Sequence, residues 1–176
     1  GEWRRVDGDL WSLEIPAAAK GRWVFRSLFK AGTTLPRARE PDEGFWTVKA
    51  VEAERRTIVL RDRLPADYAR IAGAELNTTA WWHFNRQPVA AITAERITAV
   101  RPIGTDVSSF RLNEKSHSRV WLENALPFAD TPGEWFLDPA KGVLYYRAAE
   151  GEDPNRSVFS APVLRELIVV RGEATQ

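Results

Sequence analysis

The segment from Pro132 to Tyr146 constrains the fold more than any other, because its residues carry the signals of one β-hairpin. Asp138-Pro139 opens a turn in which the proline ring fixes φ, and Gly142 supplies a residue that tolerates a positive φ. Both arms are aromatic and aliphatic, which favours paired strands. The pattern predicts that Trp135 and Tyr145 face each other across this hairpin as anchors of a hydrophobic core.

Similar strand signals recur at short spacing along the chain, separated by turn residues, and helical periodicity is nearly absent. The expected strands are residues 9–15, 23–30, 46–53, 57–62, 75–83, 89–93, 97–100, 109–112, 119–122, 134–137, 143–147 and 157–160. Ala31-Gly32 and Glu54-Arg55 are expected to close two further hairpins, and residues 65–71 and 124–127 to form short helical turns. The sequence therefore predicts an all-β fold, an antiparallel β-sandwich or barrel-like domain with one or two short helical turns.

Composition excludes several functions. The 176 residues are 44% hydrophobic and 28% charged, as in a globular domain with a sizeable core. The net charge is +1 and the basic residues are scattered, so neither a nucleic-acid nor a membrane partner is expected. No apolar run approaches the ~20 residues that cross a bilayer. The chain has no cysteine, which excludes disulfides, thiolate catalysis and cysteine-ligated zinc.

Three stretches carry a resemblance to a known group of enzymes. They are the leucine-glutamate-asparagine run within residues 121–126, the proline-glycine-glutamate-tryptophan run at residues 132–135, and the arginine-alanine-arginine-x-proline run at residues 37–41. Together they resemble a β-sandwich inserted into bacterial right-handed parallel β-helix glycoside hydrolases of the β-xylosidase and fucosidase/xylanase-like families.

The resemblance implies a division of the chain. Residues 1–161 would form the inserted β-sandwich, and residues 162–176 would leave it as a strand toward a parent β-helix domain. Gly1 and the absence of methionine fit a piece of a longer chain. In the resembling enzymes the catalytic acids lie on the β-helix, so no catalytic residue is expected here. The resemblance also implies that the parent enzyme is secreted or periplasmic.

Eight tryptophans are present, and aromatic rings are a usual means of gripping sugars. Most are expected in the core, with Trp46, Trp81 and Trp82 as exceptions. Adjacent residues of a strand point to opposite faces, so one of Trp81 and Trp82 is expected at the surface. His83 and Arg86 follow this pair and are candidates for hydrogen bonds to sugar hydroxyls, although His83 could instead lie at a sheet edge in a purely structural role.

Arg37 and Arg39 share one face if their segment is extended, so both can reach carboxylates. One of them is expected to form a structural ion pair, with Glu134 or Asp138. The other is expected at the surface that meets the parent domain.

No cofactor or metal site is expected. His83 and His117 are far apart in sequence and lack the usual ligand spacing. The chain also lacks a glycine-x-serine-x-glycine elbow and a glycine-rich phosphate loop.

Three functions remain open. The first is a non-catalytic accessory domain of a glycoside hydrolase, which lines the cleft for a plant or microbial polysaccharide or oligosaccharide, or stabilises the β-helix. The second is an autonomous carbohydrate-binding module, which would expose two or three coplanar aromatic rings. The third is a structural spacer, which would expose no aromatic cluster at all.

Overall fold

The computed structural model describes residues 1–52, 54–80, 83–104 and 118–164, together with Glu166, Ile168, Val169 and Gly172. Within this part of the chain the strands form three antiparallel sheets, and the helical elements are short 3-10 turns. The predicted all-β fold is therefore confirmed. Trp81, Trp82, His117 and the strand expected at residues 109–112 lie outside the described residues.

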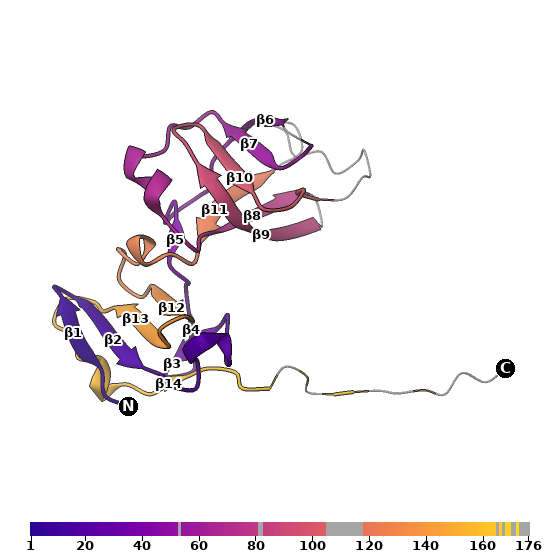
Figure 1. Ribbon diagram of the computed structural model, residues 1–176. Coiled ribbons are helices and arrows are strands. Elements are labelled where there is room, and N and C mark those ends of the chain that lie inside the picture. Colours follow the sequence, from indigo (N-terminus) through magenta and orange to yellow (C-terminus); the bar gives the residue numbers. More distant parts are fainter. Residues whose placement is uncertain are drawn as a thin grey trace.

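The largest sheet has seven strands and forms the upper lobe in Figure 1. Its strands, in spatial order, are β5 (Arg39–Glu40), β11 (Arg119–Glu123), β8 (Glu75–Ala80), β9 (His83–Ile92), β10 (Arg96–Ala99), β7 (Thr57–Leu60) and β6 (Val48–Glu52). Trp46, just before β6, forms a bridge to Val120 on β11, which links the far end of the sheet back to its beginning. The sheet is therefore barrel-like, and its buried side chains, among them Ile58, Ile97 and Leu122, form one hydrophobic cluster.

Two smaller sheets form the lower lobe in Figure 1. The four-stranded sheet runs β1 (Arg4–Asp7), β2 (Leu10–Glu14), β13 (Val143–Arg147) and β12 (Trp135–Asp138), and the three-stranded sheet runs β14 (Phe159–Ser160), β3 (Leu28–Lys30) and β4 (Thr33–Leu35). Trp3, Phe25, Trp135, Leu144 and Tyr146 belong to a second hydrophobic cluster. This lobe is built from both ends of the described chain, so the upper lobe interrupts it in sequence.

The 132–146 hairpin forms with the turn chemistry that the sequence indicates. The Gly142 amide donates to the Asp138 carbonyl at 2.8 Å, and the Asp138 side chain accepts from the amides of Ala140 and Lys141. Gly142 has φ +71°, and a Cβ there would lie 2.7 Å from the backbone nitrogen of Ala19. Both its conformation and the close backbone approach therefore require glycine.

The facing pair in this hairpin differs from the predicted one. Trp135 lies opposite Tyr146, and each is 1% exposed, whereas Tyr145 lies opposite Phe136 and is half-buried. The prediction of Trp135 as a core anchor is confirmed, and that of Tyr145 is wrong. The pairing of Asp138 with Val143 sets the register, and a shift of one residue moves a side chain to the other face.

The other predicted turns also form. Ala31-Gly32 joins β3 to β4, and Glu54-Arg55 lies between the paired strands β6 and β7, with positive φ at all four residues. The expected helical turns appear as η2 (Ala66–Arg70) and η4 (Leu126–Phe128), and η1 (Ala19–Gly21) and η5 (Pro154–Arg156) add two more. Among the described residues, no helix has the length and apolar character to cross a membrane.

Candidate functional site

The outer surface of the large sheet gathers three of the seven predicted site residues. On β11, Val120 and Leu122 are buried, so Arg119, Trp121 and Glu123 point outward. Cross-strand pairing places each of these residues in a row across the sheet. Glu123 lies between Arg39 and Glu75. Trp121 pairs with Asn77, which pairs with Arg86, and Arg119 pairs with Thr79, which pairs with Phe84. Three further residues contact this surface from loops. We call it the arginine face, comprising Arg26, Arg37, Arg39, Phe45, Glu75, Asn77, Thr79, Phe84, Arg86, Arg119, Trp121 and Glu123.

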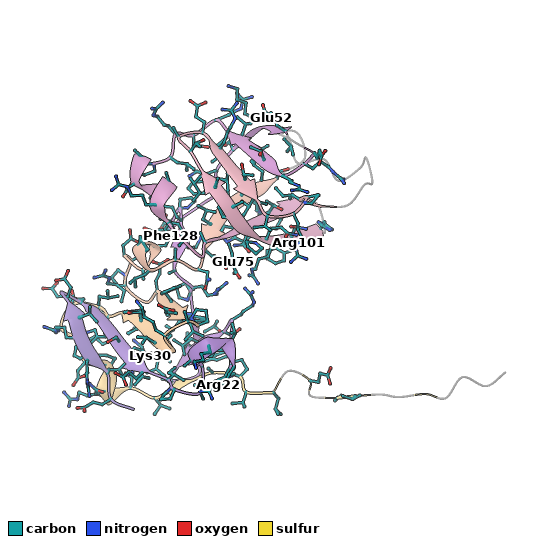
Figure 2. All side chains as sticks on the ribbon, in the orientation of Figure 1. Arg22, Lys30, Glu52, Glu75, Arg101 and Phe128 are labelled. Atoms are coloured by element: carbon teal, nitrogen blue, oxygen red, sulfur yellow. The ribbon has the colours of Figure 1, made fainter. Side chains whose placement is uncertain are left out.

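An ion-pair network crosses from one lobe to the other at this face. Arg37 Nη1 donates to Glu75 Oε2 and Glu123 Oε2, each at 2.9 Å, and its Nη2 donates to Asn124 Oδ1 at 2.5 Å. Arg26 Nη1 donates to Glu75 Oε2 at 2.7 Å. Arg26 precedes β3 of the lower lobe, whereas Glu75 and Glu123 lie on the large sheet, and Figure 2 places Glu75 between the two lobes. The network therefore ties the lobes together.

The electrostatics of this network follow from its partial burial. Burial opposes ionisation of Glu75, but hydrogen bonds from Arg26 and Arg37 outweigh it and hold the pKa of that carboxyl below its usual value. Arg86 donates from Nε to Asn77 Oδ1 at 2.8 Å, while its contacts to Glu123 and Glu75 are longer, at 3.4 and 3.5 Å. Burial lowers the pKa of the Arg86 guanidinium, although both carboxylates act in the opposite direction. Arg86 therefore makes longer contacts to the carboxylates than Arg26 and Arg37 do.

Three aromatic rings lie beside the network. Phe45 and Phe84 are exposed and lie 5.3 and 6.0 Å from the half-buried ring of Trp121. Guanidinium groups cover these rings: Arg39 lies over Phe45 and Trp121, Arg86 over Phe84, and Arg119 over Phe45, at 5.0 to 5.7 Å from the ring centres. The surface is thus a layer of arginines supported by aromatic rings.

The structure brings three of the predicted site residues, Arg37, Arg39 and Arg86, onto this one face. His83 is half-buried at the start of β9, opposite Ala80 and next to Phe84. Trp81 and Trp82 are outside the described residues, so their contact role stays a prediction.

Trp46 does not have the exposure predicted for it. Only 9% of it is exposed, and it packs in the hydrophobic cluster of the large sheet. Its backbone pairs with Val120 where the sheet closes, which turns the ring into the core. The expectation that Trp46 is a surface contact is wrong.

The arginine pair also differs from expectation in its partners. Arg37 is an ion-pair residue, as predicted for one of the two, but its carboxylates are Glu75 and Glu123. Of the two expected partners, Glu134 instead accepts the backbone amide of Arg39 at 3.2 Å, and Asp138 pairs with Lys141 at 3.5 Å. The Arg39 side chain donates to the Gly44 carbonyl and covers aromatic rings.

The sequence reasoning missed Trp121, Glu123, Glu75, Arg26 and Arg119 as members of the site. One signal was present in the sequence. Residues 119–123 alternate polar and aromatic residues with buried aliphatic ones, which places Arg119, Trp121 and Glu123 on one face. No comparable local signal connects Arg26 to Glu75, because 49 positions separate them.

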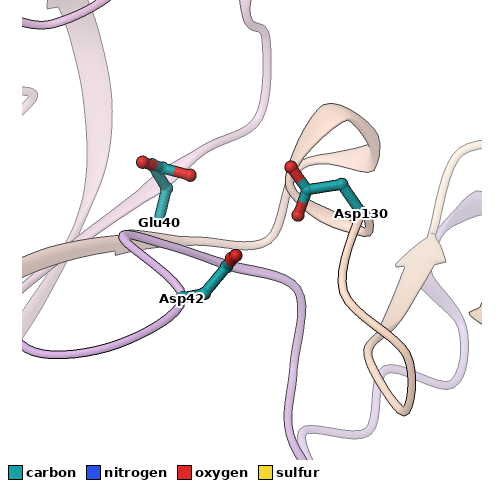
Figure 3. Close-up of side chains that lie close together, drawn as sticks. All are labelled: Glu40, Asp42 and Asp130. Carbon is teal, nitrogen blue, oxygen red and sulfur yellow. The ribbon is translucent and has the colours of Figure 1, made fainter.

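A second group of charged residues is acidic, in contrast to the arginine face. The carboxylates of Glu40, Asp42 and Asp130 offer oxygen atoms within 4.8 Å of one another, near the junction of the lobes (Figure 3). Burial raises the pKa of both Glu40 and Asp130, and the neighbouring carboxylates add to this effect. Oxygen ligands of this kind suit hard cations. Acidic groups on exposed loops commonly lie this close without a cation, so the trio by itself defines no metal site.

Glu134 lies buried next to this acidic trio. Its two carboxylate oxygens accept the backbone amides of Arg39 at 3.2 Å and Thr131 at 3.3 Å. Burial nevertheless raises the pKa of Glu134 to about 7, and the charge of Asp42 adds to the increase. Glu134 therefore links strand β5 to the loop at Thr131, and its raised pKa indicates that its charge changes near neutral pH.

A solved structure described as a glycoside hydrolase has the same fold, with a TM-score of 0.70 and 21% sequence identity. The match covers 98% of this chain and 32% of that chain, so this chain corresponds to one part of that protein. No family model matches the chain, and the search of curated proteins gives no match. At this identity the likeness shows a shared fold and assigns no residue role.

Proposed function

We propose that this chain is a non-catalytic accessory domain of a larger carbohydrate-active enzyme, an exported glycoside hydrolase with a parallel β-helix. Its arginine face would contact the saccharide, or the parent domain beside it. One observation carries the proposal: nearly the whole chain, 98%, superposes on a 32% portion of a protein described as a glycoside hydrolase. An accessory domain would match in this way, since it occupies only part of its parent.

The aromatic rings help to distinguish the alternatives. An autonomous binding module would present coplanar exposed rings, but the Trp121 plane lies at 61° to Phe45 and at 36° to Phe84. A structural spacer would expose no aromatic cluster, yet Phe45 and Phe84 are exposed beside Trp121. Among the described residues, the rings therefore favour a contact surface over either alternative.

A hydrolysis assay tests the non-catalytic role. The chain should release no product from a panel of aryl β-xylosides, α-fucosides and α- and β-galactosides. Turnover that disappears when a single Asp or Glu of this chain is replaced would overturn the proposal.

The coding sequence on either side of this segment tests whether the parent enzyme is a parallel β-helix protein. If this segment belongs to a parallel β-helix enzyme, short repeated strands of β-helix coils should be encoded on both sides of it. Flanking regions that encode an unrelated fold would contradict the proposed parent.

A further inference from the structure

The arginine face concentrates positive charge. The residues that define it include five arginines and two glutamates, an excess of three positive charges, whereas the whole chain has a net charge of +1. Part of the compensating negative charge lies in the acidic trio. A ligand that approaches the arginine face therefore meets a local excess of positive charge, although Glu40 of the acidic trio lies beside Arg39.

Arginine side chains of this face contact its aromatic rings. A neutral sugar stacks its C–H groups on a free ring face, but here guanidinium groups lie over one face of Phe45, Phe84 and Trp121 at 5.0 to 5.7 Å, although Phe45 and Phe84 are partly exposed. The rings thus orient the arginines and hold them in place. This arrangement presents planar N–H donors to a ligand, and it suits anionic groups better than the apolar face of a sugar.

Three arginines on this face are accessible, since Arg119 is exposed in addition to Arg26 and Arg86. The Arg26 side chain is 47% exposed and that of Arg86 is 28% exposed. Both contact Glu75, but Arg86 does so at 3.5 Å, longer than the 2.7 Å contact of Arg26. A carboxylate or sulfate in front of Glu75 could accept N–H groups from both side chains without displacing Arg37, which is more deeply buried.

We infer that the arginine face binds an acidic saccharide, with Arg26 and Arg86 pairing with its carboxylate or sulfate groups. This inference rests on the proposed function for the choice of a saccharide. The excess of arginine and the guanidinium groups over the rings support the choice of an anionic saccharide.

Calorimetric titration of the 176-residue chain at low ionic strength tests the inference. The probes are an oligogalacturonate for carboxylates, a heparin-derived oligosaccharide for sulfates, a neutral galacto-oligosaccharide of matched length, and a single-stranded oligonucleotide as a polyanion of another class. R26Q and R86Q remove the two accessible guanidinium groups that contact Glu75. R96Q is the matched control, because Arg96 is 48% exposed and pairs with Glu52 at 3.5 Å on another part of the sheet. Thermal melting verifies that each variant is folded.

The expected result is a Kd of about 1 mM or tighter for one acidic probe, and binding at least about tenfold weaker for the neutral probe. R26Q and R86Q should each weaken acidic binding about tenfold, R96Q should leave it unchanged, and added salt should weaken it. The two acidic probes show whether carboxylate or sulfate is preferred.

Several results would overturn the inference. They are equal binding of the neutral probe, an equal loss in R96Q, tighter binding of a single-stranded oligonucleotide than of either acidic saccharide, or no saccharide binding. None of these results contradicts the accessory role, which the hydrolysis assay and the flanking sequence test separately. Conversely, hydrolysis by the isolated chain would overturn the accessory role without affecting acidic binding.

Discussion

Replacement of Arg37 by alanine should destabilise the protein strongly, because this side chain links the two lobes. Its guanidinium donates to Glu75, Glu123 and Asn124, and only 11% of the side chain is exposed. Removing one partner of a buried ion pair costs about 3–5 kcal/mol, since the remaining charges lose their compensation. Arg86 still contacts both carboxylates, so the lower end of the range, about 3 kcal/mol, is expected.

Thermal and urea denaturation measure this effect. For a chain of this size, about 3 kcal/mol corresponds to a decrease in melting temperature of roughly 6–12 °C. R96A is the control, because Arg96 and Glu52 form an exposed pair at 3.5 Å that should contribute less than about 1 kcal/mol. The effects of replacing Arg37 and Glu123 should also be coupled. E123Q should lower the free energy of unfolding by less in the R37A background than in the native chain.

Two results would refute this account of Arg37. One is a melting temperature for R37A close to that of R96A. The other is strict additivity of R37A and E123Q, because two residues that interact directly at 2.9 Å should not act independently.

Three further predictions concern Gly142, the register of the hairpin and Glu134, and denaturation tests each of them. G142A should lower the free energy of unfolding by at least about 2 kcal/mol, because of strain at φ +71° and the 2.7 Å approach of the new Cβ to backbone. G151A is the control and should cost less, since Gly151 has φ +74° but no atom within 4 Å of the new Cβ. Equal losses would contradict the role of the close approach. W135A should cost about 3–5 kcal/mol and Y145A less, so the reverse order would contradict the observed register. In the folded protein the pKa of Glu134 is raised from 4.5 to about 7. Between these pH values the folded chain keeps a proton that the unfolded chain has lost. The free energy of unfolding should therefore fall by up to about 3 kcal/mol as the pH rises from 4.5 to 7. E134Q should flatten this dependence, and an unchanged pH profile would exclude Glu134 as its cause.

Local sequence determined the turns of this protein. Asp138 binds amides two and three residues ahead of it, and Gly142 adopts a positive φ, so both act within a few positions of the chain. The same holds for Ala31-Gly32 and Glu54-Arg55, whose hairpins were predicted. Alternation at residues 119–123 likewise indicates an outward face containing Arg119, Trp121 and Glu123. These features depend on backbone geometry that neighbouring residues fix.

Register and closure required the tertiary structure. The pairing of Asp138 with Val143 makes Trp135 face Tyr146, and a loop of a different length would have selected Tyr145. Trp46 is buried because the sheet curls until its backbone reaches Val120, which is a property of the whole sheet. The sequence near Trp46 contains no sign of this contact.

The partners of Arg37 were likewise decided by the tertiary structure. Its own segment could indicate only that the side chain would seek carboxylates. Glu75 and Glu123 come together on neighbouring strands β8 and β11, and Arg26 approaches them from the other lobe. Ion pairs between distant segments depend on which strands are adjacent, so the arginine face exists only once the seven-stranded sheet has assembled.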